Sequence, residues 1–182
     1  MKLYLLSFLL FQGIISKAQN DAEKIFWIED GLTWNDFQGS VDNSSPFNAN
    51  TNAGLSFGWG VKNDNGVIEL TYEVTSYFNP GLSWVKKDSY NDYLLRHEQL
   101  HFDITELHAR KLRKKVAEIN ISQLGKDPRI VITRVYQSVE KERSAMQQKF
   151  DRESKHSLDK DAEARWQQFV RAELKKYPGE NT

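Results

Sequence analysis

The most informative stretch of the sequence is RHEQLHFDITELHARKL, residues 96–112. It contains His97-Glu98-Gln99-Leu100-His101, an HExxH motif. On a helix, residues four apart lie on one face, about 6 Å from each other along the axis. Two imidazoles in this arrangement can bind one Zn²⁺, and the glutamate between them can reach a water at the metal. The spacing therefore predicts a zincin-like metal-binding helix.

The same helix places both histidines on its core-facing side. At about 100° per residue, His101 falls about 40° from His97, and Glu98 falls about 100° away, at the edge of that side. Six apolar or aromatic residues lie within about 60° of His97, namely Tyr90, Tyr93, Leu94, Leu100, Ile104 and Leu112. An unpaired buried histidine is costly. We therefore predict zinc ligands at His97 and His101 and a general base at Glu98, against the alternative of two hydrogen-bonded core histidines.

A zinc site needs a third protein ligand, and the chain offers only 4 His and no Cys. Asp103 and Glu106 project away from His97 and are expected on a solvated face. His108 points the right way, but it lies about 10 Å along the axis from His101. Neither the acidic pair nor His108 is therefore expected to complete the site.

His156 is the remaining histidine, and it falls in a polar segment, residues 150–158, between two predicted helices. A loop ligand can return to a metal helix without geometric restriction. We predict His156 as the third zinc ligand, and Asp151 and Glu153 in the same segment are the alternatives.

The residues before this helix predict a small antiparallel sheet, within about residues 25–84. From Val67 to Phe78, apolar and polar residues alternate with a period of two. Asn63-Asp64-Asn65-Gly66 has the composition of a turn, so Thr51–Val61 is the expected partner strand. Ile25–Ile28 is a weaker candidate strand.

Three helices are predicted within about residues 88–177. The first runs from about Ser89 to Asn120, with Asp88 or Ser89 as its N-cap. The second runs from about Pro128 to Phe150 and is capped by Asp127, and the third from about Lys160 to Tyr177. Together with the sheet, they predict a single α+β domain over residues 19–182.

Composition narrows the class of partner. The 182 residues include 25 Lys plus Arg and 25 Asp plus Glu, so the formal net charge is zero. This balance argues against nucleic acid, which usually requires a basic face, and against a polybasic membrane anchor. Without Cys there are no disulfides, thiolate metal sites or cysteine lipidation. Composition does not indicate an oligomeric state.

Residues 1–18 are expected to form a signal peptide. A basic Met1-Lys2 precedes an apolar run, Leu3–Ile15, which is shorter than the roughly 20 residues that span a bilayer. Ser16-Lys17-Ala18 carries small residues where a signal peptidase reads them, which predicts cleavage after Ala18. The alternative is an uncleaved anchor. Cleavage predicts export to the periplasm or the medium, without a stable membrane anchor.

Three segments resemble the bacterial family called domain of unknown function 922. They are residues 32–39 (LTWNDFQG), residues 96–112, and residues 150–156 (FDRESKH) with Trp166 after them. Members of this family are described as predicted secreted zinc-dependent proteases, and the resemblance implies this activity here. It also implies His156 as a ligand, because a histidine recurs in the third segment. Family members often follow this histidine with glycine, where the chain has Ser157.

The residues and the resemblance together predict a secreted zinc peptidase that acts on peptides or proteins, although another amide, such as a cell-wall peptide, would fit as well. Glu98 would take a proton from water at the zinc. Tyr136, His108 and Arg152 are candidates for a second oxyanion donor. The rival hypothesis is an exported binding or structural module with a structural zinc or no metal. A catalytic site keeps an open position, whereas a structural site has four protein ligands.

Overall fold

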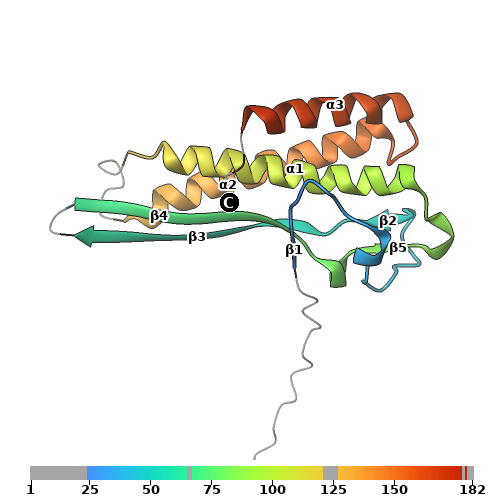
Figure 1. Cartoon of the computed structure of the whole chain (residues 1–182), viewed down its shortest axis with the longest axis horizontal. Coiled ribbons are helices and arrows are strands. Elements are labelled where there is room, and N and C mark those ends of the chain that lie inside the picture. Colours follow the sequence, from blue (N-terminus) through green and yellow to red (C-terminus); the bar gives the residue numbers. More distant parts are fainter. Residues whose placement is uncertain (1–23, 65–66, 121–126, 178, 180–182) are drawn as a thin grey trace, which may run out of the picture.

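A computed structural model describes residues 24–64, 67–120, 127–177 and 179. Short strands and one long hairpin fill the first half of this part of the chain, and three long helices follow (Figure 1). The prediction of an α+β fold, with a small antiparallel sheet before three helices, is confirmed. The predicted signal peptide lies outside the described residues.

The hairpin consists of β3, Ala53–Asp64, and β4, Val67–Phe78. The two strands pair antiparallel along their whole length, from Ala53 opposite Phe78 to Asp64 opposite Val67. β1, Ile25–Phe26, adds a short third strand on the other side of β4. The predicted partner strand and the weaker strand near residue 25 are thus confirmed. Of the predicted turn, Asn65 and Gly66 lie outside the described residues.

A second small sheet, which the sequence did not predict, joins β2, Ala49–Asn50, to β5, Trp84–Val85. The chain between β1 and β2 packs beside it through a short 3-10 turn, η1, Trp34–Asp36. Leu32 and Phe37 flank this turn and are buried in one cluster with β2 and β5 residues. The aromatic segment therefore closes the end of the hydrophobic core next to the start of α1.

The first helix, α1, runs over Asp92–Ala117, and its N-cap is Asn91, whose side chain accepts a hydrogen bond from the Leu94 amide. The predicted caps, Asp88 and Ser89, are wrong. Residues 87–89 instead form a separate 3-10 turn, η3, and Tyr90 and Asn91 are extended. An Asn or Asp side chain at an extended position can accept a hydrogen bond from a free amide at the start of a helix. Asn91 does so here, and the helix therefore begins three residues after the predicted start at Ser89.

The second helix, α2, spans Pro128–Ser154 with Asp127 as its N-cap, and the third, α3, spans Lys160–Lys176 with Asp159 as its N-cap. Asp127 was predicted correctly. The predicted end of α2 at Phe150 is wrong, because the helix continues for one more turn. Asp151 and Glu153 therefore lie on α2 rather than in a loop, and this turn brings Asp151 close to His97 and His101.

The helices form two layers over the hairpin. α1 and α2 lie side by side against β3 and β4, and α3 covers the opposite side of α1 and α2 (Figure 1). One core cluster joins hairpin residues such as Leu55 and Val74 to α1 and α2. Another joins α1 to Phe150 of α2 and Trp166 of α3. α1 is consequently covered on several sides.

This central position overturns the expectation that Asp103 and Glu106 face solvent. Glu106 is 4% exposed, accepts a 2.6 Å hydrogen bond from Ser76 Oγ, and pairs with Arg110 at 2.8 Å. Asp103 Oδ1 accepts hydrogen bonds from the side chains of Trp27 and Gln99. Helical angles alone place these carboxylates away from the histidines, but the sheet and the β1 segment cover that side as well.

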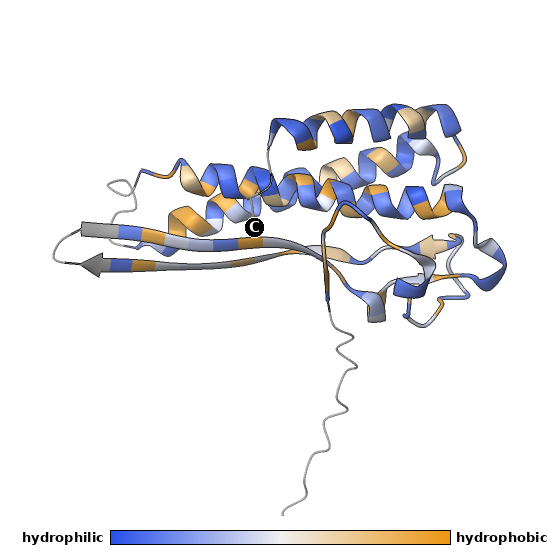
Figure 2. Cartoon of the chain, in the orientation of Figure 1, coloured by the Kyte–Doolittle hydropathy of each residue, from blue (hydrophilic) through white to orange (hydrophobic). Residues whose placement is uncertain are grey.

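Within the described residues, no helix is long and apolar enough to cross a membrane. Hydrophobic and hydrophilic residues instead follow one another at short intervals along all three helices (Figure 2).

Candidate metal centre

His97, His101 and Asp151 form a group that could hold a metal ion, with one ligand atom from each lying within 4.8 Å of the others. The two Nε2 atoms converge on one carboxylate oxygen, Asp151 Oδ1. His101 Nε2 lies 3.1 Å from it and His97 Nε2 lies 3.6 Å from it. Two ligands therefore come from consecutive turns of α1 and one from the last turn of α2.

The other nitrogen of each imidazole has a partner of its own. His97 Nδ1 lies 3.1 Å from Glu163 Oε2, and His101 Nδ1 lies 2.6 Å from Gln147 Oε1. Both partners are oxygen acceptors, so each Nδ1 is expected to keep its proton when Nε2 gives its lone pair to a metal ion. This is the arrangement in which outer carboxylates and amides orient metal-binding histidines.

Glu163 belongs to α3 and is 1% exposed. Its Oε2 also accepts a hydrogen bond from the Tyr93 hydroxyl at 3.2 Å, while Oε1 has no partner among the described residues. A buried carboxylate with so few donors is held at an energetic cost. Its contact with His97 ties the third helix to the site.

The charges of the group are strongly coupled. Burial by itself would lower the pKa of His97, but hydrogen bonds to Asp151 and Glu163 and the charge of Glu98 raise it to about 9. Burial would raise the pKa of Asp151, yet hydrogen bonds from His101 and His97 hold it well below its usual range. The group thus pairs ionised carboxylate with imidazolium when only protons are bound, and a cation would take the place of those protons.

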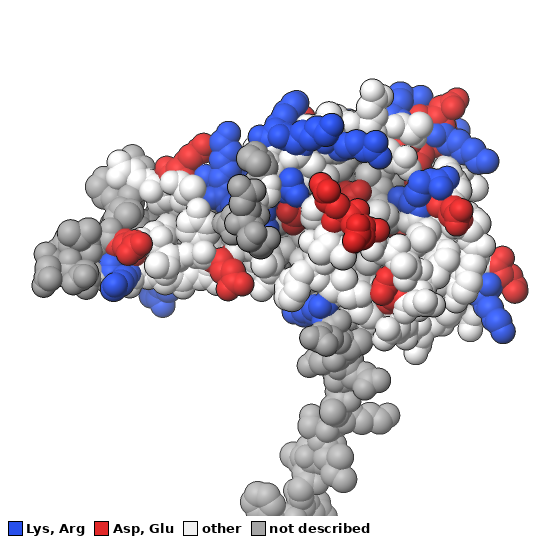
Figure 3. Space-filling model, viewed as in Figure 1, with Lys and Arg blue, Asp and Glu red and all other residues white. Residues whose placement is uncertain are grey.

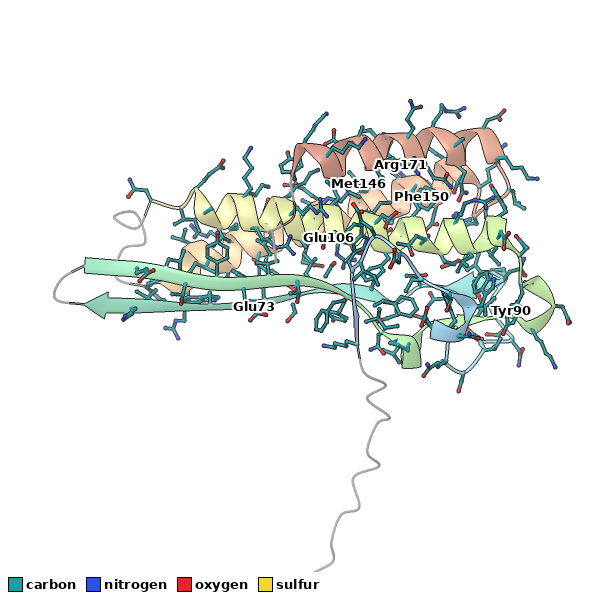
Figure 4. The ribbon with its side chains drawn as sticks, viewed as in Figure 1. Glu73, Tyr90, Glu106, Met146, Phe150 and Arg171 are labelled. Atoms are coloured by element: carbon teal, nitrogen blue, oxygen red, sulfur yellow. The ribbon has the colours of Figure 1, made fainter. Side chains whose placement is uncertain are left out.

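Phe150 packs behind the two imidazoles. Its ring centroid lies 4.6 Å from that of His97 and 4.9 Å from that of His101, and its side chain is fully buried. It comes from α2 and lies in the layer between α1 and α3 (Figure 4). Because Trp166 of α3 contacts its other side at 5.6 Å, the histidine rings rest against a fixed apolar surface.

The group lines a pocket of about 480 Å³, together with Glu98. Glu98 is 4% exposed, and its backbone carbonyl accepts a hydrogen bond from Thr51 Oγ1 at 3.3 Å. This bond joins α1 to the chain just after β2, and residues 46–51 form one wall of the pocket. The HExxH glutamate therefore lies where it can contact a molecule bound beside the histidines.

His156 is not a member of the three-residue group, and its role as a ligand stays a prediction. It lines the same pocket, and its Nδ1 lies 3.7 Å from Asp151 Oδ1. Its side chain is 47% exposed, and its ring contacts that of Phe47 with centroids 4.5 Å apart. His156 thus lies at the rim of the pocket, beside Asp151, which was predicted from the sequence as an alternative third ligand.

The turn that carries His156 is left-handed. Lys155, His156 and Ser157 have φ values of 51°, 51° and 68°, a region that costs non-glycine residues roughly 1–2 kcal/mol each. The resemblance implied glycine at the position of Ser157, and the positive φ gives a physical reason for glycine there. The backbone carbonyl of Ser154 stabilises the turn by accepting hydrogen bonds from the amides of Leu158 and Asp159.

The other candidates lie elsewhere. Glu153 Oε2 accepts a hydrogen bond from Trp166 Nε1 at 2.9 Å. Tyr136 stacks on Phe57 over the hairpin. The pocket of the histidines is lined by none of Glu153, Tyr136, Arg152 and the buried His108. The arginine that lines this pocket is Arg143.

Sequence reasoning missed the partners Gln147 and Glu163. Gln147 precedes Asp151 by four residues, so an α2 helix extended by one turn would have placed both on one face. Glu163 lies 66 residues from His97, and no local spacing connects them. Only the packing of α3 against α1 does so.

Residues 30–157 match the model of a bacterial protein family of unknown function, DUF922, and the chain belongs to this family. The match includes all three residues of the metal group and ends before Glu163. Comparisons with curated proteins and with solved structures gave no match.

Proposed function

We propose that this protein is a zinc-dependent hydrolase of the peptidase type, with His97, His101 and Asp151 as ligands and Glu98 as general base. The observation that carries the proposal is the convergence of two Nε2 atoms on Asp151 Oδ1, at 3.1 and 3.6 Å, with both Nδ1 atoms already facing acceptors. Two imidazoles and one carboxylate are a donor set typical of catalytic zinc. The donors therefore fit this ion.

A zinc ion in such a site supplies Lewis acidity, which polarises a carbonyl and acidifies water. Glu98 accepts the proton of the attacking water and returns it to the leaving amine. Glu163 and Gln147 hold the two imidazoles in place, and Phe150 excludes water from behind them. Residues 46–51 form a wall along which an extended peptide can lie beside Glu98.

One observation favours the alternative of a structural zinc in a binding module. His156 Nδ1 lies 3.7 Å from Asp151 Oδ1, so His156 is near enough to be considered as a fourth ligand. Four protein ligands would close the site. The two functions therefore differ in whether His156 binds the ion.

Catalysis is tested with Glu98→Gln and turnover of a broad peptide library. We expect the variant to keep its zinc and its fold but to lose hydrolysis by several orders of magnitude, because base and metal act as a unit. Glu118→Gln is a matched control, since Glu118 is an exposed glutamate at the end of the same helix. Equal turnover by wild type and Glu98→Gln would contradict the proposal.

We further propose that the protein is exported after cleavage behind Ala18. The basis is the apolar segment Leu3–Ile15 and the small residues that follow it. Sequencing the amino terminus of the protein from periplasm or medium should give Gln19. Recovery of the intact amino terminus in the membrane fraction would contradict cleavage.

A further inference from the structure

A second pocket lies on another face of α1, between this helix, α3 and the segment after β1. Its volume is about 480 Å³, and it shares no lining residue with the pocket of the histidines. At about 100° per residue, the α1 residues Gln99, Asp103 and Arg110 point about 120–160° away from His97. We call this cavity the α1–α3 pocket. Its full lining is Trp27, Glu29, Arg96, Gln99, Leu100, Asp103, Arg110, Gln167, Arg171, Leu174 and Lys175.

Basic side chains dominate the charge of the α1–α3 pocket. Four of its lining residues are Arg or Lys and two are Asp or Glu, an excess of two positive charges. Lys and Arg also gather along α3 on the face of the molecule seen in Figure 3. The whole chain has a formal net charge of zero, so this excess is a local property of the pocket.

Two of the charged groups are already engaged. Asp103 Oδ1 accepts a 2.8 Å hydrogen bond from Trp27 Nε1 and a 2.7 Å hydrogen bond from Gln99 Nε2. Arg110 pairs with Glu106 at 2.8 Å and donates to the carbonyls of Leu174 and Tyr177. These contacts hold the walls of the pocket in place. Because Asp103 and Arg110 already have partners, neither is expected to be the principal binding group for a ligand.

Three exposed cations of the pocket, Arg96, Arg171 and Lys175, make no hydrogen bond or ion pair in the part of the chain that the structure describes. Burial raises the pKa of Asp103 and the charge of Arg171 lowers it, but the Arg171 guanidinium donates no hydrogen bond to that carboxylate. Arg171 lies on the side of α3 that faces α1 (Figure 4). Arg96 comes from α1 on the other side of the cavity, so two guanidinium groups from different helices border one space. Planar guanidinium groups suit carboxylate and phosphate oxygens, which they can bind by two parallel hydrogen bonds.

The pocket also offers apolar surface. Trp27, Leu100 and Leu174 contribute this apolar surface. The Arg110 guanidinium lies over the Trp27 ring, 5.1 Å from its centroid. Small-molecule sites typically combine such a surface with a few fixed polar groups. A bare inorganic anion would leave the apolar surface unused.

We propose that the α1–α3 pocket binds a small organic anion in which a phosphate or carboxylate adjoins an aromatic or apolar part. Arg96 and Arg171 bind the anionic group, and the apolar part lies against Trp27. This site is separate from the metal centre, and the proposal does not depend on hydrolase activity.

The probe is phenyl phosphate, which is titrated into the mature protein, residues 19–182, by calorimetry at low ionic strength. Phenol and inorganic phosphate are titrated in parallel. We expect saturable binding of phenyl phosphate at one site, and weaker binding of both fragments. Arg171→Gln should reduce the affinity by about tenfold or more, as loss of a charge-assisted hydrogen bond does. Arg134→Gln should leave it unchanged, because Arg134 is an exposed, unpaired arginine of the described part of α2 outside the pocket.

Absence of phenyl phosphate binding would overturn the proposal, and so would phenol binding as tightly as phenyl phosphate. A phosphate can also bind a metal, so Asp151→Asn is titrated as well. Affinity that falls with Asp151→Asn but not with Arg171→Gln would place the anion at the metal centre and refute the α1–α3 pocket. Equal loss in Arg171→Gln and Arg134→Gln would show non-specific attraction and refute it too.

Discussion

Replacing His108 by leucine should make the free energy of unfolding fall less in mild acid than it does in the wild type. His108 is 1% exposed, and its Nδ1 lies 2.7 Å from the Ile104 carbonyl. Its buried Nε2 has no partner among the described residues. Burial lowers the pKa of His108 to about 4. The hydrogen bond to the Ile104 carbonyl opposes this shift, and the charges of Lys111, Glu142 and Arg143 contribute less. The folded protein therefore holds this histidine neutral.

The sign of the effect follows from which state binds the proton. The unfolded chain protonates His108 near its ordinary pKa of about 6.5, so between about pH 6.5 and pH 4 it binds more protons than the folded chain. Folding stability therefore falls as the pH falls through this range. The shift of roughly 2.5 pKa units corresponds to about 3.4 kcal/mol in full, of which about 2 kcal/mol is lost between pH 7 and pH 5.

The assay is urea denaturation of wild type and His108→Leu at pH 7 and pH 5, with chelator present so that metal release does not contribute. We expect the free energy of unfolding to fall by about 2 kcal/mol less in the variant than in wild type. His108→Gln, which keeps a polar side chain but does not titrate, should show the same reduction. An identical pH dependence in all three proteins would show that His108 does not cause the loss of stability.

Three further results are expected. Asp151→Asn should weaken zinc binding by orders of magnitude, measured by competition with a chromophoric chelator. A larger loss of zinc affinity in His156→Ala would instead identify His156 as the third ligand. Glu163→Gln should weaken zinc binding by roughly 10–100-fold through the orientation of His97. The comparison is Glu173→Gln, a glutamate of the same helix outside the metal centre, and equal affinities of the two variants would disprove this role. Phe150→Ala should lower the free energy of unfolding by about 3–5 kcal/mol, and a change under about 1 kcal/mol would contradict its place in the core.

The helices and strands that depend on local pattern could be predicted from the sequence. Alternation over residues 67–78 predicted β4, and the turn residues before it predicted its pairing with β3. Asp127 followed by Pro128 marked the start of α2, because a capping side chain and a proline without an amide both favour a first helical turn. The HExxH spacing placed His97 and His101 on one face of α1.

The last turn of α2 was beyond the reach of local pattern. Residues 151–154 are polar and carry no strong helix signal, so their sequence reads as a connector. In the folded chain, Phe150 is fully buried between α1 and α3, and Ser154 is buried as well. Packing of this turn against two other helices stabilises it, which propensity alone does not do.

The choice of Asp151 over His156 in the metal group, and the outer contacts of the histidines, depend on how the helices pack. Asp151 reaches His101 because α2 lies beside α1, and Glu163 reaches His97 because α3 covers both helices. Packing of α1 against β4 buries Glu106, which the helical angle had assigned to solvent. A helical pattern specifies which residues share a face, whereas the neighbour that covers each face is set by the burial of apolar surface from distant parts of the chain.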